Sequence, residues 1–128
     1  MKGKTVVISF TGLIVIIWLL TACGAPAATA SNPTEFKVTA TDFKFEPADL
    51  TLKAGQKIKL TMTNKGAIDH TWLLKDASGK ELSQTLTVKN GETKSLEFAA
   101  PAAPGTYTLV CDIPGHKELG MVGKVIVQ

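Results

Sequence analysis

The stretch QKIKLTMTN, residues 56–64, determines the fold expected for this chain. Its apolar residues Ile58, Leu60 and Met62 alternate with lysine and threonine, so a strand here buries one face and leaves the other in water. Turn residues, mostly glycine, punctuate the chain at intervals of roughly 8 to 12 residues, the spacing of a β-sandwich. We therefore predict one all-β domain, residues 35–128, with seven or eight strands. The same alternation recurs at Phe43/Phe45, Leu50/Leu52, Leu86/Val88, Leu96/Phe98 and Tyr107/Leu109/Cys111.

The first 34 residues differ from this domain. A positively charged start precedes an apolar run, Val6–Leu20, which ends in small residues before Cys23. This pattern is typical of a secretory signal, and it resembles the signal of bacterial lipoproteins, which are cleaved just before a cysteine that then receives lipid. We interpret residues 1–22 as a signal peptide, Cys23 as the lipidated residue and the rest of 23–34 as a flexible linker. An uncleaved membrane helix is the alternative.

This interpretation places the domain outside the cytoplasm, tethered to the cell membrane on its periplasmic or outer side.

All 14 basic residues are lysines, and 11 residues are acidic. Once the two lysines of residues 1–22 are removed, 12 lysines face 11 acids, a net charge of +1. Because the lysines are scattered, we expect no nucleic-acid partner.

The segment CDIPGHKELGM, residues 111–121, contains side chains with metal-binding chemistry. Cys111, His116 and Met121 offer a thiolate, an imidazole and a thioether, and a Cys-His-His set with a weak axial Met is the ligand set of blue-copper sites. The missing histidine is His70, the only other one in the chain. It begins a predicted strand directly after a loop, and a sandwich gathers the loops of one end. We therefore predict one copper ion bound by His70, Cys111, His116 and Met121.

Other readings of these residues are less consistent with the pattern. A disulfide between Cys111 and Cys23 is common chemistry for an exported protein, but lipidation would remove Cys23 as a partner. Zinc prefers a fourth nitrogen, oxygen or thiolate ligand and gains little from a thioether. Taken singly, each predicted ligand would be an ordinary core or surface residue, and the combination is what favours copper.

The strings DHTW (69–72), APGTYTLVC (103–111) and CDIPGHKELGMVGKV (111–125) resemble the copper-binding signature of the cupredoxins. Four residues between Cys and His and four between His and Met are closest to the spacing in auracyanin, a membrane-associated cupredoxin related to plastocyanin and azurin. The resemblance implies a Greek-key β-sandwich and a type 1 copper site with Met121 as the axial ligand. Thr71 stands where many members have an asparagine that hydrogen-bonds near the Cys sulfur, which leaves the redox potential open.

These features predict a single-electron carrier rather than an enzyme, since an oxidase or reductase would need a second copper centre with further histidines. We expect a monomer that docks transiently with redox proteins, using a partly exposed edge of His116 as the electron port. A copper-delivery protein outside the cytoplasm is the main alternative. A metal-free adhesion or structural module is a third possibility, although it does not explain the ligand spacing.

Overall fold

The computed structural model describes residues 32–128, so the predicted signal peptide, Cys23 and most of the predicted linker lie outside the described residues. Within residues 32–128 the chain forms nine strands and no helix. These residues accordingly include no helix that could span a membrane. The strands are β1 (Thr34–Thr41), β2 (Lys44–Glu46), β3 (Asp49–Leu52), β4 (Lys57–Asn64), β5 (His70–Lys75), β6 (Leu86–Val88), β7 (Thr93–Ala99), β8 (Gly105–Val110) and β9 (Val122–Val127).

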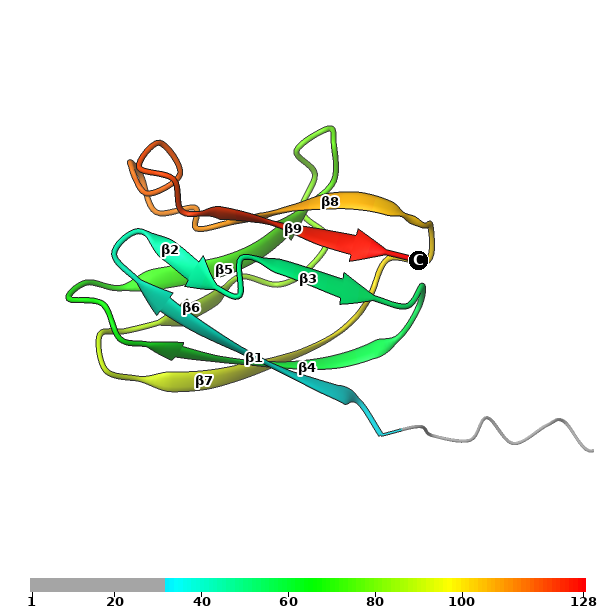
Figure 1. Cartoon of the computed structure of the whole chain (residues 1–128), viewed down its shortest axis with the longest axis horizontal. Helices are drawn as coiled ribbons and strands as arrows, with labels where there is room; N and C mark the ends of the chain where they lie inside the picture. Colours follow the sequence, from blue (N-terminus) through cyan, green and yellow to red (C-terminus); the bar gives the residue numbers. More distant parts are fainter. Residues whose placement is uncertain (1–31) are drawn as a thin grey trace, which may run out of the picture.

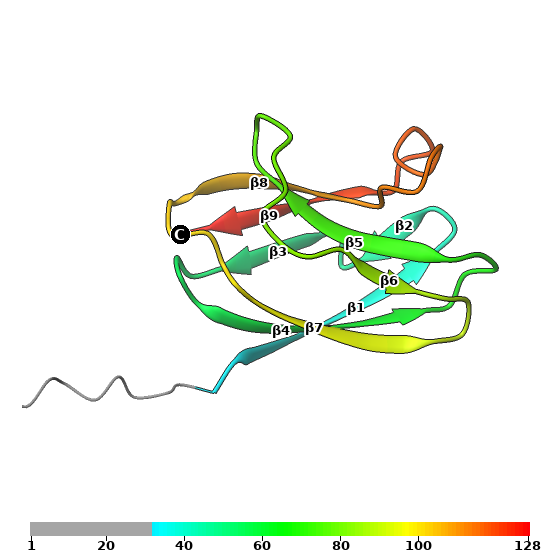
Figure 2. The ribbon, with the colours of Figure 1, turned by 180° about the vertical axis from the view of Figure 1, so that it is seen from behind.

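The strands form two layers that face each other, as the opposite views of Figures 1 and 2 show. One sheet has the order β2-β1-β4-β7 and the other the order β3-β9-β8-β5-β6. Both sheets are mixed, because β1 runs parallel to β4 and β3 runs parallel to β9, while the remaining pairs are antiparallel. The prediction of an all-β sandwich is confirmed.

The alternation in β4 has the predicted consequence. Ile58, Leu60 and Met62 are at most 1% exposed, whereas the lysines and threonines between them are partly or fully accessible. The two sheets meet through such inward side chains; the rings of Trp72 on β5 and Phe98 on β7, for example, lie 5.3 Å apart. Removing these apolar surfaces from water is the main favourable contribution to folding.

The structure differs from the sequence-based expectation in three details. The ninth strand is β1, which is additional to the seven or eight strands expected, although its inward residues Phe36, Val38 and Ala40 alternate with polar residues in the sequence. Phe43 lies in the turn between β1 and β2 rather than in a strand with Phe45. Cys111 lies one residue beyond the end of β8, although its backbone N–H still pairs with the carbonyl of Met121.

The connections at one end of the sandwich, on the left in Figure 1, include the β1–β2 turn, the β4–β5 loop and the β8–β9 loop. We call this end the metal pole. The start of β1 and the C-terminus lie toward the other end, where Ala54 donates a hydrogen bond to the carbonyl of Gln128. The fold thus separates the start of β1 and the C-terminus from the connections around the predicted ligands.

Candidate metal centre

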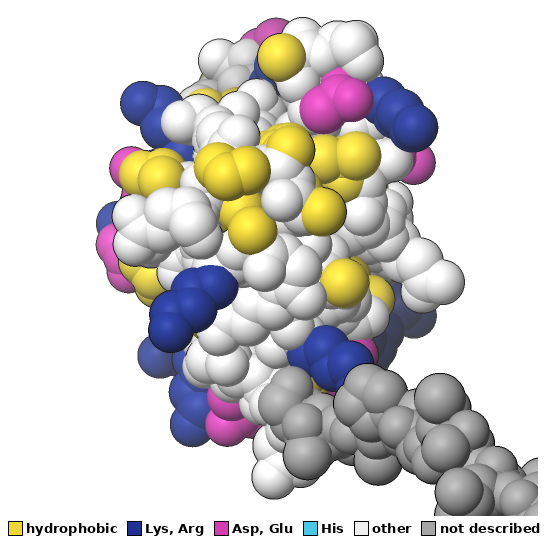
Figure 3. Space-filling model, turned by 90° about the vertical axis from the view of Figure 1, so that its right-hand side faces the viewer, with side chains coloured by type: hydrophobic (Ala, Val, Ile, Leu, Met, Phe, Trp, Pro, Cys, Tyr) yellow, Lys and Arg dark blue, Asp and Glu magenta, His cyan; other side chains and the backbone are white. Residues whose placement is uncertain are grey.

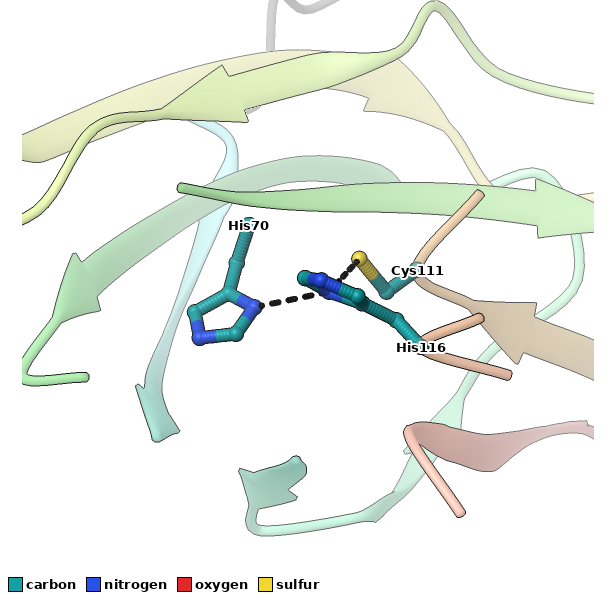
Figure 4. Close-up of side chains that lie close together, drawn as sticks. All are labelled: His70, Cys111 and His116. Carbon is teal, nitrogen blue, oxygen red and sulfur yellow. Dashed lines mark hydrogen bonds between the residues drawn. The ribbon is translucent and has the colours of Figure 1, made fainter. Parts of the chain in front are cut away.

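Three of the predicted ligands converge at the metal pole. His70 is the first residue of β5, Cys111 directly follows β8, and His116 lies in the β8–β9 loop. Their donor atoms all lie within 4.8 Å of one another, and all three residues are buried. Nδ1 of His116 is 3.3 Å from Nδ1 of His70 and 3.3 Å from Sγ of Cys111 (Figure 4). A metal at about 2.0 to 2.3 Å from each donor would bridge separations of this size.

Met121, the fourth predicted ligand, is fully buried beside this group. Its N–H donates to the carbonyl of His116 at 3.0 Å, and its carbonyl accepts the N–H of Cys111 at 3.1 Å. The backbone of Met121 is therefore bonded to two of the three converging residues. The structure brings all four predicted residues to one place, although His70 and Cys111 are far apart in the sequence.

Two glycines allow the backbone of the β8–β9 loop, residues 111–121, to turn where it does. Gly115 and Gly120, with φ angles of 88° and 98°, directly precede His116 and Met121. These φ angles are in the left-handed region, which costs other residues about 1 to 2 kcal/mol. Bonds from His116 N–H to the Ile113 carbonyl and from Gly120 N–H to the Lys117 carbonyl close the turns between them. Each glycine lets the chain reverse just before a predicted ligand.

His116 lies in an apolar environment. Its ring meets the ring of Phe43 edge to face, with the centroids 5.0 Å apart. Burial, followed by the charge of His70, lowers the pKa of His116, so the neutral imidazole with a free lone pair is favoured. The residue is 7% exposed and His70 is 0% exposed. His116 is thus the more accessible of the two histidines, with a smaller exposed edge than the sequence suggested.

The sulfur of Cys111 is held by Thr71. The backbone N–H of Thr71 donates to Sγ at 3.3 Å. The Thr71 hydroxyl lies 3.5 Å from Sγ, but it lies only 2.6 Å from Oδ1 of Asp112. Since a hydroxyl has one proton, the carboxylate is its stronger acceptor and the backbone N–H is the main donor to sulfur. The hydroxyl oxygen of Thr71 also accepts the N–H of Asp112 at 2.9 Å, so it joins the start of β5 to the segment that follows β8.

The ring of His70 is oriented from its far side by a residue that the sequence did not single out. Nε2 of His70 is 2.8 Å from Oδ1 of Asp42, in the β1–β2 turn. The bond from the Ala67 N–H, together with the one from His70, lowers the pKa of Asp42. A carboxylate only accepts hydrogen bonds, so Nε2 carries the proton and Nδ1 offers its lone pair.

Asn64 shapes the β4–β5 loop that leads to His70. Its side-chain amide donates to the carbonyls of Ile68 and Val88 at 2.8 and 3.0 Å, and its oxygen accepts the N–H of Gly66 at 2.9 Å. The only hint of this role in the sequence is an Asn followed two residues later by Gly, which is common in turns. Asp42, Phe43 and Asp112 gave no comparable signal, because each acts through a contact with a distant part of the chain.

The donor set fits copper better than zinc. Two imidazole nitrogens and a thiolate, with a buried thioether beside them, match the soft ligand set of type 1 copper. The nearest carboxylates, Asp42 and Asp112, are each engaged by another side chain. Within residues 32–128 no further His, Cys, Asp or Glu side chain joins these three as the fourth ligand that zinc prefers.

Comparisons with known proteins agree with this chemistry. A family model described as a cupredoxin-like domain matches residues 12–127. The copper-resistant cuproprotein CopI of Rubrivivax gelatinosus is 28% identical over 123 residues, which cover 84% of this chain and 74% of that protein. Auracyanin-A of Chloroflexus aurantiacus is 27% identical over 113 residues, 68% of each chain. The solved structure of auracyanin A, a "blue" copper protein of that bacterium, superposes with a TM-score of 0.67 at 26% identity, covering 76% of this chain and all of the other.

We expect Thr71→Val to lower the free energy of unfolding of the metal-free protein by about 1 to 3 kcal/mol, because both side-chain bonds to Asp112 are lost. Urea denaturation followed by tryptophan fluorescence would measure it. Thr106→Val, at an exposed position on β8, is the control and should change the value by about 0.5 kcal/mol at most. Equal stability of the two variants would contradict the structural role given to Thr71.

Proposed function

Because this chain belongs to the cupredoxin-like domain family, with one copper ion as its cofactor, we propose that it is an electron carrier with His70, Cys111, His116 and Met121 as the copper ligands. Its membership of this family confirms the resemblance expected from the sequence. The observation that supports the proposal most is the buried convergence of two imidazoles and a thiol at the metal pole.

Carrier function requires a site that changes little when an electron arrives. Copper would supply the one-electron chemistry, alternating between Cu(I) and Cu(II). The chain supplies rigidity: His70 and Cys111 lie at the ends of paired strands, and the Thr71 N–H is directed at the sulfur. Burial of all three donor residues excludes water and external ligands. His70 and His116 are the only histidines in the sequence, which argues against a second copper centre and so against an oxidase or reductase.

We place the electron port at His116. This histidine retains 7% exposure, and the β8–β9 loop around it presents Leu119, which is 61% exposed, and the start of β9, where Val122 is 39% exposed. Apolar side chains of this kind suit weak, short-lived contacts between redox proteins. We therefore propose that redox partners dock transiently at this part of the metal pole and that the protein acts as a monomer.

The start of β1 lies at the end of the sandwich opposite the metal pole, which is where a tether from Cys23 would join the domain. Strand β1 begins at Thr34, and eight residues later it leads into the turn that contacts His70. A strand of that length spans about 26 Å. Hydrophobic side chains gather on the end that includes the start of β1, with lysines around them (Figure 3). If Cys23 is lipidated outside the cytoplasm, the tether joins the domain at this end and leaves the metal pole accessible to redox partners.

A copper-delivery or copper-resistance role is the second candidate. The similarity to CopI, which is described as a copper-resistant cuproprotein, favours it. Such a protein would hand copper over, whereas a carrier keeps copper in both oxidation states. Retention of copper on reduction is therefore the property that separates the two functions.

Addition of Cu(II) to the purified protein should produce an intense visible absorption from thiolate-to-copper charge transfer, which bleaches on reduction and returns on reoxidation. Cys111→Ser should abolish the band, and Cys23→Ser should keep it. Elemental analysis after gel filtration of the reduced protein would show whether copper stays bound. Loss of copper on reduction would favour delivery, and a colourless wild-type protein would contradict a type 1 site.

His116→Gly should open the metal centre at the port. We expect added imidazole to change the visible spectrum of this variant and not that of the wild type, because the small residue leaves a ligand position accessible. Electron self-exchange, measured by NMR line broadening, should slow at least tenfold. Lys117→Gly, at the exposed neighbouring position, is the control. Unchanged self-exchange in His116→Gly would place the port elsewhere.

Mass spectrometry of the protein isolated from bacterial membranes should find a mature chain that begins at an acylated Cys23. Cys23→Ser should lose the acyl mass and leave the lipid-extracted fraction, whereas Cys111→Ser should retain both. An unmodified wild-type chain that begins at Met1 would rule out the lipid anchor.

A further inference from the structure

Asp42 makes two contacts that link the β1–β2 turn to the metal pole. Its Oδ1 accepts the hydrogen bond from Nε2 of His70 at 2.8 Å, and its Oδ2 accepts the backbone N–H of Ala67 at 2.9 Å. The His70 side chain is fully buried, whereas the Asp42 side chain is 32% exposed. The carboxylate therefore connects a buried imidazole to the surface of the protein.

Gly66 shows that the loop is shaped around this pair. A Cβ atom on Gly66 would lie 2.8 Å from Nε2 of His70 and still closer to Oδ1 of Asp42. Distances under 3.0 Å are essentially never seen for real Cβ atoms. Gly66 itself is held in place, since its N–H donates to Asn64 and its carbonyl accepts the side-chain amide of Asn90. Only glycine at this position lets the loop pass so close to the hydrogen bond.

A histidine that binds a metal through one nitrogen is commonly oriented by an acceptor on the other, and a carboxylate acceptor also raises the basicity of the ring. Asp42 provides such an acceptor on the side of His70 that faces away from Cys111 and His116. Its negative charge attracts the doubly charged form of copper more strongly than the singly charged form.

We propose that Asp42 is a positioning residue of the metal centre, which fixes His70 with Nδ1 directed at the metal and lowers the reduction potential by favouring oxidised copper. This proposal rests on the proposed copper function. It assigns a role to the β1–β2 turn, which contributes none of the four predicted ligands.

Two substitutions of Asp42 distinguish its effect on the orientation of the His70 ring from the effect of its charge on the reduction potential. Asp42→Asn removes the charge and one of the two acceptor oxygens, and its remaining oxygen can accept the Nε2–H of His70 in place of the Ala67 N–H. We therefore expect a higher reduction potential with the His70 tautomer unchanged. Asp42→Ala removes the acceptor as well, so we expect the tautomer to become mixed and copper affinity to fall about 10- to 100-fold. Gly66→Ala should resemble Asp42→Ala, because the added methyl group displaces the carboxylate from the ring.

Asp76→Asn is the matched control. Asp76 is also a loop aspartate that accepts backbone N–H groups, from Ser78 and Lys80, but it follows the far end of β5 from His70. Reduction potential and tautomer should both remain at the wild-type values in this variant.

The measurements use the purified full-length protein in detergent. Nitrogen-15 NMR shifts of the His70 ring report the tautomer in the metal-free protein, competition with a chelator reports copper affinity, and voltammetry reports the potential. Wild-type tautomer and affinity in both Asp42→Ala and Gly66→Ala would overturn the positioning role. An unchanged potential in Asp42→Asn would overturn the effect of charge.

The same measurements distinguish failure of the proposed role of Asp42 from failure of the proposed copper function. If the wild type binds no copper, the copper function fails, while the tautomer of the metal-free protein still decides whether Asp42 fixes His70. If the wild type is blue and the Asp42 variants behave like Asp76→Asn, the copper function stands and the role of Asp42 is refuted.

Discussion

In the antiparallel pairing of β5 with β8, Leu73 lies opposite Val110 and Leu74 lies opposite Leu109. Because the two strands run in opposite directions, the start of β5 and the end of β8 meet at one end of the sandwich, which places His70 near Cys111. A slip of one residue would turn every side chain of a strand to the other face and remove one of the two donors from the site. The bonds between Thr71 and Asp112 reinforce this register beyond the last strand pair.

The polar residues buried within the described part of the chain are concentrated at the metal pole. They are Asn64, His70, Thr71 and His116, whereas the rest of the buried core is apolar. A buried polar group destabilises a protein unless it is paired, and here each of the four has hydrogen-bond partners. The apolar core fixes the two sheets, and the polar network fixes the direction of each donor atom. The candidate ligands are therefore buried together with the apolar core, at its metal-pole end.

Much of this arrangement could be predicted from the sequence. The alternation in β4 predicted a sandwich, and the Cys111–Met121 spacing, with only two histidines in the chain, led to four residues that the structure brings together. Strand β1 shows the same alternation at Phe36, Val38 and Ala40, so the sequence also contains the signal for the ninth strand. Phe43 was assigned to a strand because a period of two cannot distinguish a strand residue from one in an adjacent tight turn.

The class of fold and the chemical identity of the donor atoms can be derived from the residues alone, since alternation and ligand type are properties of residues close together in the chain. The groups that surround those atoms follow from the folded arrangement: Asp42 contacts the far nitrogen of His70, the Thr71 N–H donates to the sulfur, and Phe43 packs against His116. These contacts join segments that no local pattern relates. Hydrogen bonds and ring contacts act over a few ångströms in space whatever the separation along the chain, so their partners follow from the packing of the two sheets.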